Sequence, residues 1–176
     1  KYHGLWEGYH NNGQLGYEGN YKDGERVGLW KHYHENGQLV SKSNFKDGKL
    51  DGLWEGYYDN GQLRSKCNYK DGKRHGISKW YHENGQLESK GNHKDVEMYG
   101  EMDGLWEYYH ENGQIEVKGN YKDGKKEGLW EWYHENGQLR EKGNYKDGKE
   151  DGLWEVLNKD GSLKRTETWK DGELLE

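Results

Sequence analysis

Large apolar side chains alternate with polar ones in short runs that recur along the whole chain. The run GLWEWY at Gly128–Tyr133 is representative, and in an extended strand its Leu129 and Trp130 would point to opposite faces. Asn-Gly or Asp-Gly pairs bound the runs, and such pairs mark tight turns between antiparallel strands. Because glycines and turn pairs interrupt every possible helical run, the pattern predicts successive β-hairpins.

The runs belong to a longer unit that repeats with a nearly fixed period. Each unit opens with a glycine: Gly28 follows Gly4 by 24 residues, and Gly104 follows Gly76 by 28. The opening glycines are Gly4, Gly28, Gly52, Gly76, Gly104, Gly128 and Gly152. Since such units are stabilised mainly by their neighbours, we expect one array over residues 1–176. The predicted fold is all-β: an elongated, single-layer antiparallel β-sheet of about seven tandem hairpin repeats, twisted into a trough.

The repeat also predicts a strand register. Both kinds of turn pair are expected to form two-residue type I′ loops, whose twist matches that of paired strands. With Asn136-Gly137 as such a loop, Trp130 lies opposite Gly143 and Glu131 lies opposite Lys142. A large ring then faces a small residue, which is favourable cross-strand packing.

Aromatic residues gather on one face of the predicted sheet. The third and eighteenth positions of the repeat share this face, and they are mostly Trp and Tyr. The members that we expect to line an aromatic groove, together with the neighbouring Trp80, are Trp6, Trp30, Trp54, Trp80, Trp106, Trp130, Tyr21, Tyr69, Tyr121 and Tyr145. Two interpretations stay open: packing between repeats, or a groove for an extended peptide, a strand or a glycan.

The fourth unit breaks the pattern. Ser78 replaces the usual Trp, His93 replaces the usual Tyr, and an irregular insertion occupies residues 95–103. The insertion predicts a longer loop that carries Val96, Met98, Tyr99 and Met102. The loop is either a lengthened hairpin that kinks the sheet or a binding loop, because function concentrates on irregular loops.

Composition narrows the classes of function. A net charge of -6 disfavours binding to nucleic acid and to anionic lipid, which require clustered Lys and Arg. Only 29% of the residues are hydrophobic, but an aromatic content of 14% and the strict period argue against disorder. The repetition and the missing initiating Met favour a bacterial, exported or cell-surface fragment, although the sequence leaves the compartment unknown.

No constellation of residues points to catalysis or to a cofactor. A ladder of histidines comprises His10, His34, His82, His110 and His134. Members one repeat apart should lie two strands, or about 9.6 Å, apart, which is too far for a shared zinc ion. We therefore expect these histidines to hydrogen-bond at the turns. The repeated glutamates have repeated environments, so they do not form a unique acid–base pair. The sequence predicts no enzyme, no cofactor and no metal site.

The repeated text resembles a known family. The recurring pattern G-L-W-E-x-Y-x-E-N-G-Q-L-x-x-K-G-N-Y-K-D-G-K runs from Gly4 to Gly172 and is similar to the bacterial variant of the MORN repeat. The resemblance implies successive β-hairpins, a role in protein interaction or dimerisation, and no catalytic residues. Members of this variant family often carry an antitoxin label.

The function that we expect from the sequence is a non-enzymatic repeat scaffold. It would bind a protein partner, or a second copy of itself, through the aromatic groove. Two alternatives stay open: a carbohydrate- or cell-surface-binding module in which a glycan stacks on the rings, and an antitoxin-type neutralising protein.

Overall fold

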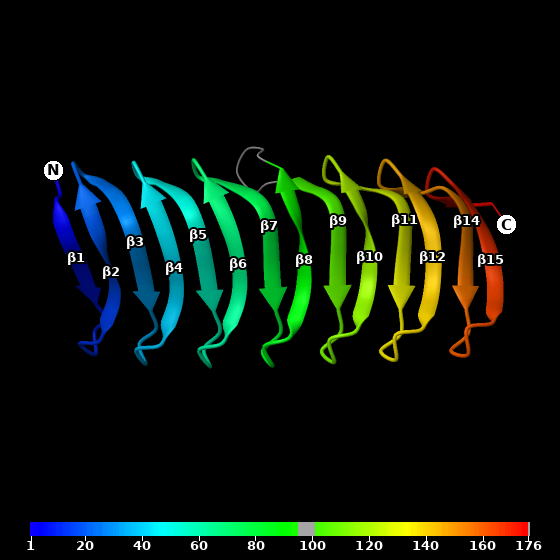
Figure 1. Ribbon diagram of the computed structural model, residues 1–176, viewed down its shortest axis with the longest axis horizontal. Coiled ribbons are helices and arrows are strands. Elements are labelled where there is room, and N and C mark those ends of the chain that lie inside the picture. Colours follow the sequence, from blue (N-terminus) through cyan, green and yellow to red (C-terminus); the bar gives the residue numbers. More distant parts are fainter. Residues whose placement is uncertain (95–100, 176) are drawn as a thin grey trace. The chain divides into compact units, whose positions relative to one another are not determined.

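The computed structural model describes residues 1–94 and 101–175, which form sixteen strands of one open, antiparallel sheet (Figure 1). The all-β fold of tandem hairpins that the repeat predicts is confirmed. The chain divides into two compact units. Of the described residues, the first unit contains residues 1–85 and Lys94, and the second contains residues 86–93 and 101–175.

In the first unit, each strand pairs with the next along the chain. The strands are β1 (Gly4–Tyr9), β2 (Leu15–Lys22), β3 (Glu25–Tyr33), β4 (Leu39–Lys46), β5 (Lys49–Tyr57), β6 (Leu63–Lys70) and β7 (Lys73–Tyr81).

The second unit repeats this order and becomes irregular near its end. Its strands are β8 (Leu87–Lys94, whose last residue belongs to the first unit), β9 (Glu101–Tyr109), β10 (Ile115–Lys122), β11 (Lys125–Tyr133), β12 (Leu139–Lys146), β13 (Lys149–Glu150), β14 (Gly152–Leu157), β15 (Leu163–Lys170) and β16 (Glu173–Leu174). Both β13 and β14 pair with β12, so one long strand of the regular hairpins is here split in two.

The Asp-Gly turns have the predicted geometry. Asp123 and Gly124 both have positive φ angles, 48° and 76°, and Lys122 pairs directly with Lys125. Two successive positive φ angles define a type I′ turn, and Asp and Gly are among the residues that accept them at low cost.

The Asn-Gly turns do not have the predicted geometry. In the loop after β11 only Gly137 has a positive φ angle, and the loop is closed by a bond from the His134 N–H to the Gln138 carbonyl. Three residues therefore form the loop instead of two. Tyr133 pairs with Leu139 and Trp132 with Glu141, so Arg140 is an extra, bulged residue. The bulge restores the register that the shorter loop would have produced.

The repeat-opening glycines form a second kind of bulge. Asn120 pairs with Glu127, but Gly119 pairs with Trp130, so Gly128 and Leu129 are extra residues in β11. The φ angle of Gly128 is 70°, a left-handed conformation that disfavours a side chain.

This register places each buried Trp over a glycine of the preceding hairpin. Trp130 pairs with Gly119 on one side and with the predicted Gly143 on the other. A Cβ atom built on Gly119 would overlap the indole ring of Trp130, so the ring lies flat on the bare backbone. The same overlap holds at Gly19, Gly91 and Gly143, beneath Trp30, Trp106 and Trp154. These four indoles are 1–5% exposed and form most of the apolar core.

In the first unit, Trp54 packs differently because its partner in the preceding strand is not a glycine. Ser43 pairs with Trp54, and Trp54 stays only half-buried. Its ring instead lies above Gly56, where an added Cβ would come within 2.5 Å of the indole. The side chain of Ser43 occupies the space that the indole takes over a glycine, so the ring turns to the next bare backbone.

The irregular fourth unit is only partly as predicted. Met102 does not lie in a loop: it belongs to β9, is half-buried, and its carbonyl accepts a bond from the Gly124 N–H as in other repeats. The extra residues therefore end before β9 begins at Glu101. The other residues expected in the loop, Val96, Met98 and Tyr99, lie outside the described residues.

Candidate interaction surface

The tryptophan face is defined by the third-position Trp residues and the eighteenth-position aromatic residues of the repeats. In the second unit, Trp130 contacts Tyr121 edge-on at 5.0 Å between centroids, and Tyr145 at 6.0 Å. Lys126 lies over Trp130 with its Nζ atom 4.5 Å from the ring centroid. Burial lowers the pKa of Lys126, and Glu150 partly opposes the shift. The ring is thus enclosed by neighbours on several sides.

Three residues predicted for the aromatic groove, Trp30, Trp106 and Trp130, are 1% exposed. A ligand could not stack on these rings without displacing their neighbours. The other residues of the predicted groove are half-buried, namely Trp6, Trp54, Trp80, Tyr21, Tyr69, Tyr121 and Tyr145. A binding role for this face stays a prediction that rests on the half-buried rings alone.

The opposite face carries an exposed aliphatic row, which we call the leucine face. Its members occupy the second position of each repeat: Leu5, Leu29, Leu53 and Ile77 in the first unit, and Leu105, Leu129 and Leu153 in the second. Leu53 is half-buried, and the other six are exposed. In the second unit these three side chains are 51%, 48% and 54% exposed. Row members in successive repeats are two strands, or about 9.6 Å, apart.

Ion pairs run beside the leucine face and join one hairpin to the next. Glu131 lies opposite Lys142, as predicted, but its carboxylate binds Lys118 of the preceding hairpin at 2.8 Å. Lys90–Glu107 and Lys142–Glu155 repeat this arrangement at 2.7 and 2.8 Å. Since Glu131 has a Lys on both sides, the sequence could not decide between them.

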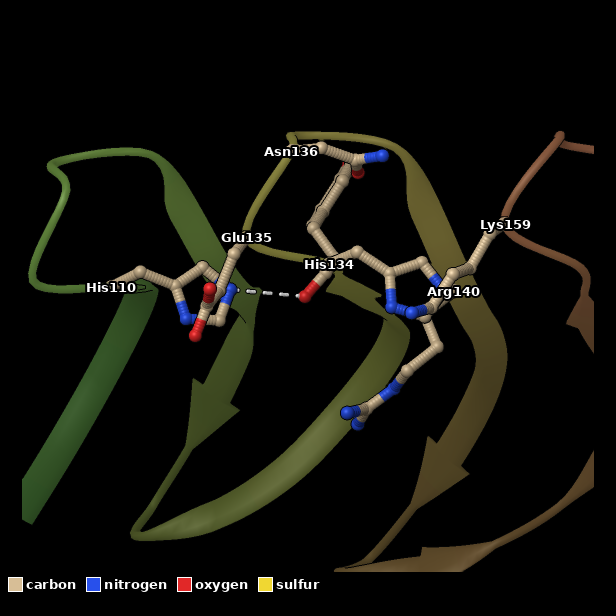
Figure 2. Close-up of a pocket in the computed structure, with 7 residues that line it drawn as sticks. His110, His134, Glu135, Asn136, Arg140 and Lys159 are labelled. Atoms are coloured by element: carbon tan, nitrogen blue, oxygen red, sulfur yellow. Dashed lines mark hydrogen bonds between the residues drawn. The ribbon is translucent and has the colours of Figure 1, made fainter.

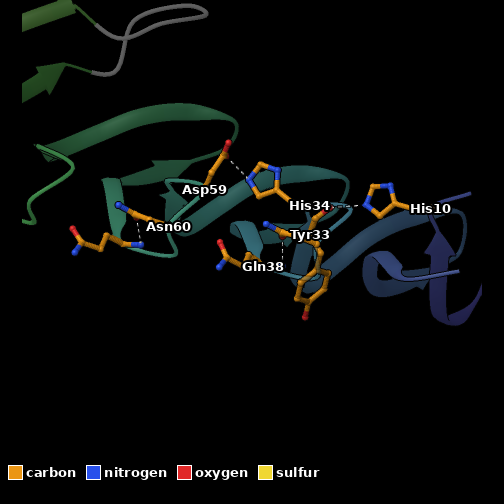
Figure 3. A network of polar contacts seen from close by, with 8 residues as sticks. His10, Tyr33, His34, Gln38, Asp59 and Asn60 are labelled. Carbon is orange, nitrogen blue, oxygen red and sulfur yellow. Dashed lines mark hydrogen bonds and ion pairs between the residues drawn. The ribbon is translucent and has the colours of Figure 1, made fainter. Parts of the chain in front are cut away.

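The loop edge of the hairpins also joins neighbouring repeats (Figure 3). His10 Nε2 lies 2.8 Å from the Tyr33 carbonyl, and the Asn12 side chain donates to the Glu35 carbonyl at 2.7 Å. In the second unit, His110 Nε2 lies 3.1 Å from the Tyr133 carbonyl. The prediction that the histidines hydrogen-bond at the turns is confirmed for His10 and His110.

A shallow pocket of about 410 Å³ lies at this edge in the second unit (Figure 2). Its lining residues are His110, Tyr133, His134, Glu135, Asn136, Arg140 and Lys159. Sequence reasoning missed this pocket, because Arg140 reaches it from a bulge and Lys159 replaces the Glu of most other repeats.

The described residues contain no cluster of three His, Cys, Asp or Glu side chains that could hold a metal ion. His32 stacks on Trp30 and lies tilted against Tyr17, and burial together with Arg26 lowers its pKa. Burial raises the pKa of the Cys67 thiol, so this residue is a poor nucleophile. Within the described part of the chain, no helix is long and apolar enough to cross a membrane.

Comparison with solved structures gives a match to a chain of the crystal structure of the GtfA/B complex bound to UDP and GlcNAc. The match has 14% identity and a TM-score of 0.28, and it covers 64% of this chain but 21% of that chain. The present chain therefore spans about a fifth of that relative. Comparison with curated protein sequences gives no match.

A family model described as "MORN repeat variant" matches the chain six times. The matched residues are 2–23, 26–47, 50–71, 74–95, 102–123 and 126–147, which together make up well over half of the chain. Each match spans one strand–turn–strand segment of the repeat, and the divergent hairpin β14–β15 lies beyond the last match. The chain belongs to the MORN repeat variant family.

Proposed function

We propose that this chain is a protein-binding scaffold without catalytic activity, and that it binds its partner through the leucine face. The observation that carries this proposal is the exposure of consecutive aliphatic side chains in one row, about half of each in the second unit. Apolar surface gathered in this way on a protein usually marks a site of interaction.

The charged and amide side chains that flank the leucine face suit a protein partner. The Lys–Glu pairs flank the leucines with both signs of charge, and the exposed Asn120 and Asn144 lie opposite Leu105 and Leu129. An apolar strip beside paired charges and amides resembles the core and rim of a protein interface. A second copy of the chain and an unrelated protein are both partners of this kind.

The tryptophan face gives less support to the alternative of glycan binding. Stacking on a sugar requires an open ring face, and the most regular indoles of this face are buried. The antitoxin alternative would be one instance of protein binding, with a toxin as the partner.

The test compares the wild-type chain with the triple variant Leu105→Thr, Leu129→Thr and Leu153→Thr. Threonine keeps the preference for strand but removes most of the apolar surface. Light scattering over a range of concentrations first measures self-association, and immobilised protein then measures capture of partners. The control Lys122→Thr with Lys146→Thr changes exposed residues at strand ends.

The proposal expects an assembly or a captured partner that survives the control substitutions and is lost in the triple leucine variant. If the leucine variant retains every assembly and partner of the wild type, this face is not the binding surface. Variants of the half-buried rings, such as Trp6→Ala, would then test the tryptophan face instead.

A further inference from the structure

Two pockets of the loop edge are built from equivalent positions, one in each unit. The pocket in the first unit, of about 430 Å³, is lined by Tyr57, Tyr58, Asp59, Asn60, Arg64 and Glu83. Adding 76 to each of these numbers gives six lining residues of the second-unit pocket, Tyr133, His134, Glu135, Asn136, Arg140 and Lys159. Since the two pockets lie at equivalent repeat positions and have similar volumes, each pocket serves as a control for the other.

The two pockets differ in charge. The arginine and the acidic residue of the loop are present in both, but Glu83 of the first unit corresponds to Lys159 of the second. Counting Asp, Glu, Lys and Arg, the lining carries one net negative charge in the first unit and one net positive charge in the second. Only the second pocket is therefore suited to an anion.

In the second pocket, no described residue forms an ion pair with Arg140 or Lys159. Arg140 is the bulged residue of β12, and a bulge re-aims the side chain that it carries. Neither Arg140 nor Lys159 forms an ion pair or side-chain hydrogen bond with any residue that the structure describes. Glu135 is drawn on the His110 side of the pocket, and Arg140 and Lys159 are drawn on the other (Figure 2).

A third donor in this pocket lacks its usual partner. His10 and His110 each bond to the Tyr carbonyl of the next repeat. The Nε2 atom of His134 is buried and has no hydrogen-bond partner among the described residues. A buried polar atom without a partner is costly and is commonly explained by a ligand or ion.

We propose that Arg140, Lys159 and His134 form a binding site for a phosphate group. A guanidinium can bind two phosphate oxygens at once, an ammonium adds a point charge, and the imidazole supplies an N–H donor. The volume accommodates a phosphate together with part of a molecule that carries it. This site is independent of the leucine face, so either can fail without the other.

The experiment follows the histidine resonances by NMR during titration at constant ionic strength. Inorganic phosphate and phosphoserine are the probes, and acetate is the comparison anion. We expect saturable phosphate binding in the millimolar range, with the largest shift at His134. Tighter binding of phosphoserine would identify a phosphorylated molecule as the ligand, and equal binding would identify free phosphate; both support the site.

Matched variants test which residues bind. Arg140→Gln is expected to weaken phosphate binding by at least about tenfold, because a charged hydrogen bond is lost. Arg64→Gln changes the equivalent residue of the first unit and should have no effect. Lys159→Glu should abolish binding, and Glu83→Lys should create a second, weaker site in the first unit. All four residues are exposed at the loop edge, so the variants are expected to fold.

Three results would overturn the proposal. The first is the absence of a saturable response to phosphate in the wild-type chain. The second is an equal response to acetate and phosphate, which would mean unspecific screening of charge. The third is an equal loss of binding in Arg64→Gln and Arg140→Gln.

Discussion

Leu129 and Trp130 are neighbours in β11, yet 48% of the first and 1% of the second is exposed. Both belong to ladders with the same period, so periodicity does not explain the difference. The indole of Trp130 lies on the bare backbone of Gly119 and is enclosed by Tyr121 and Lys126. Leu129 lies opposite Asn144, and no comparable bare backbone is available to it. The tryptophan face thus stabilises the array, whereas the leucine face stays open.

The largest expected effect comes from removing a buried ring. Trp130→Ala should lower the free energy of unfolding by about 3–5 kcal/mol, because a cavity replaces a fully packed indole. Urea denaturation followed by circular dichroism measures the change. The matched substitution of its neighbour, Leu129→Ala, should have a much smaller effect, and equal losses would mean that the two faces are not different in kind.

Filling the space beneath the ring should also destabilise the chain. Gly119→Ala introduces a Cβ that overlaps the Trp130 indole, with an expected cost of about 1–3 kcal/mol. The displaced ring should show red-shifted fluorescence, as expected for a more exposed indole. Ser43→Ala is the control, since position 43 already carries a Cβ and Trp54 has turned away. An unshifted spectrum in Gly119→Ala would contradict the packing described above.

Tyr145, on the tryptophan face, should make the stability of the fold decrease at alkaline pH. Burial, followed by the charge of Glu150 and the hydrogen bond to it, raises the pKa of Tyr145 above its usual value of 10.0. Below pH 10.0 the hydroxyl is protonated in both the folded and unfolded chain, so its contribution is complete. As pH rises above that value, the unfolded chain loses the proton first and stability falls. Melting temperatures should therefore decline less steeply in Tyr145→Phe, and identical slopes would contradict the assignment.

A still smaller effect is expected from the ion pairs beside the leucine face. Glu131→Gln removes the 2.8 Å contact to Lys118 between half-exposed side chains, so the loss should be below about 1 kcal/mol. Because exposed charges are screened, the loss should shrink further at high salt. Urea denaturation at two salt concentrations measures both. A loss that is large and independent of salt would mean that the pair is an essential link between hairpins.

The smallest effect on stability belongs to the exposed leucines themselves. Leu129→Thr should change the free energy of unfolding by no more than about 0.5 kcal/mol, as is usual for surface positions. The measurement is the same denaturation experiment. A loss as large as that of Trp130→Ala would show that the leucine row is part of the core and not a surface kept free for a partner.

The register could be predicted from the sequence because one contact dominates it. A large ring requires a small residue opposite, and that rule places Trp130 against Gly143 whatever the loop does. The same rule could not reveal the loop geometry. A three-residue loop with a bulge at Arg140 and a two-residue loop without one produce the same pairing at Trp130.

The candidate surfaces were harder to predict than the fold. Both ladders contain large apolar residues, and only the packing of the indoles onto glycines determines which one is buried. The anion pocket depends on a single exchange, Glu83 against Lys159, and on a bulged arginine whose direction is not visible in the sequence. The signal that could have revealed it is the change of charge at one repeat position.

The most direct test of the central claim compares the reactivity of like residues on the two faces. Hydroxyl-radical footprinting of the free chain, read by mass spectrometry, reports the accessibility of each side chain. We expect Trp130 and Trp106 to be protected relative to the half-buried Trp6, and Leu129 to react faster than the half-buried Leu139. If Trp130 reacts as fast as Trp6 and Leu129 is protected, then the tryptophan face is the open one and the leucine face is the core.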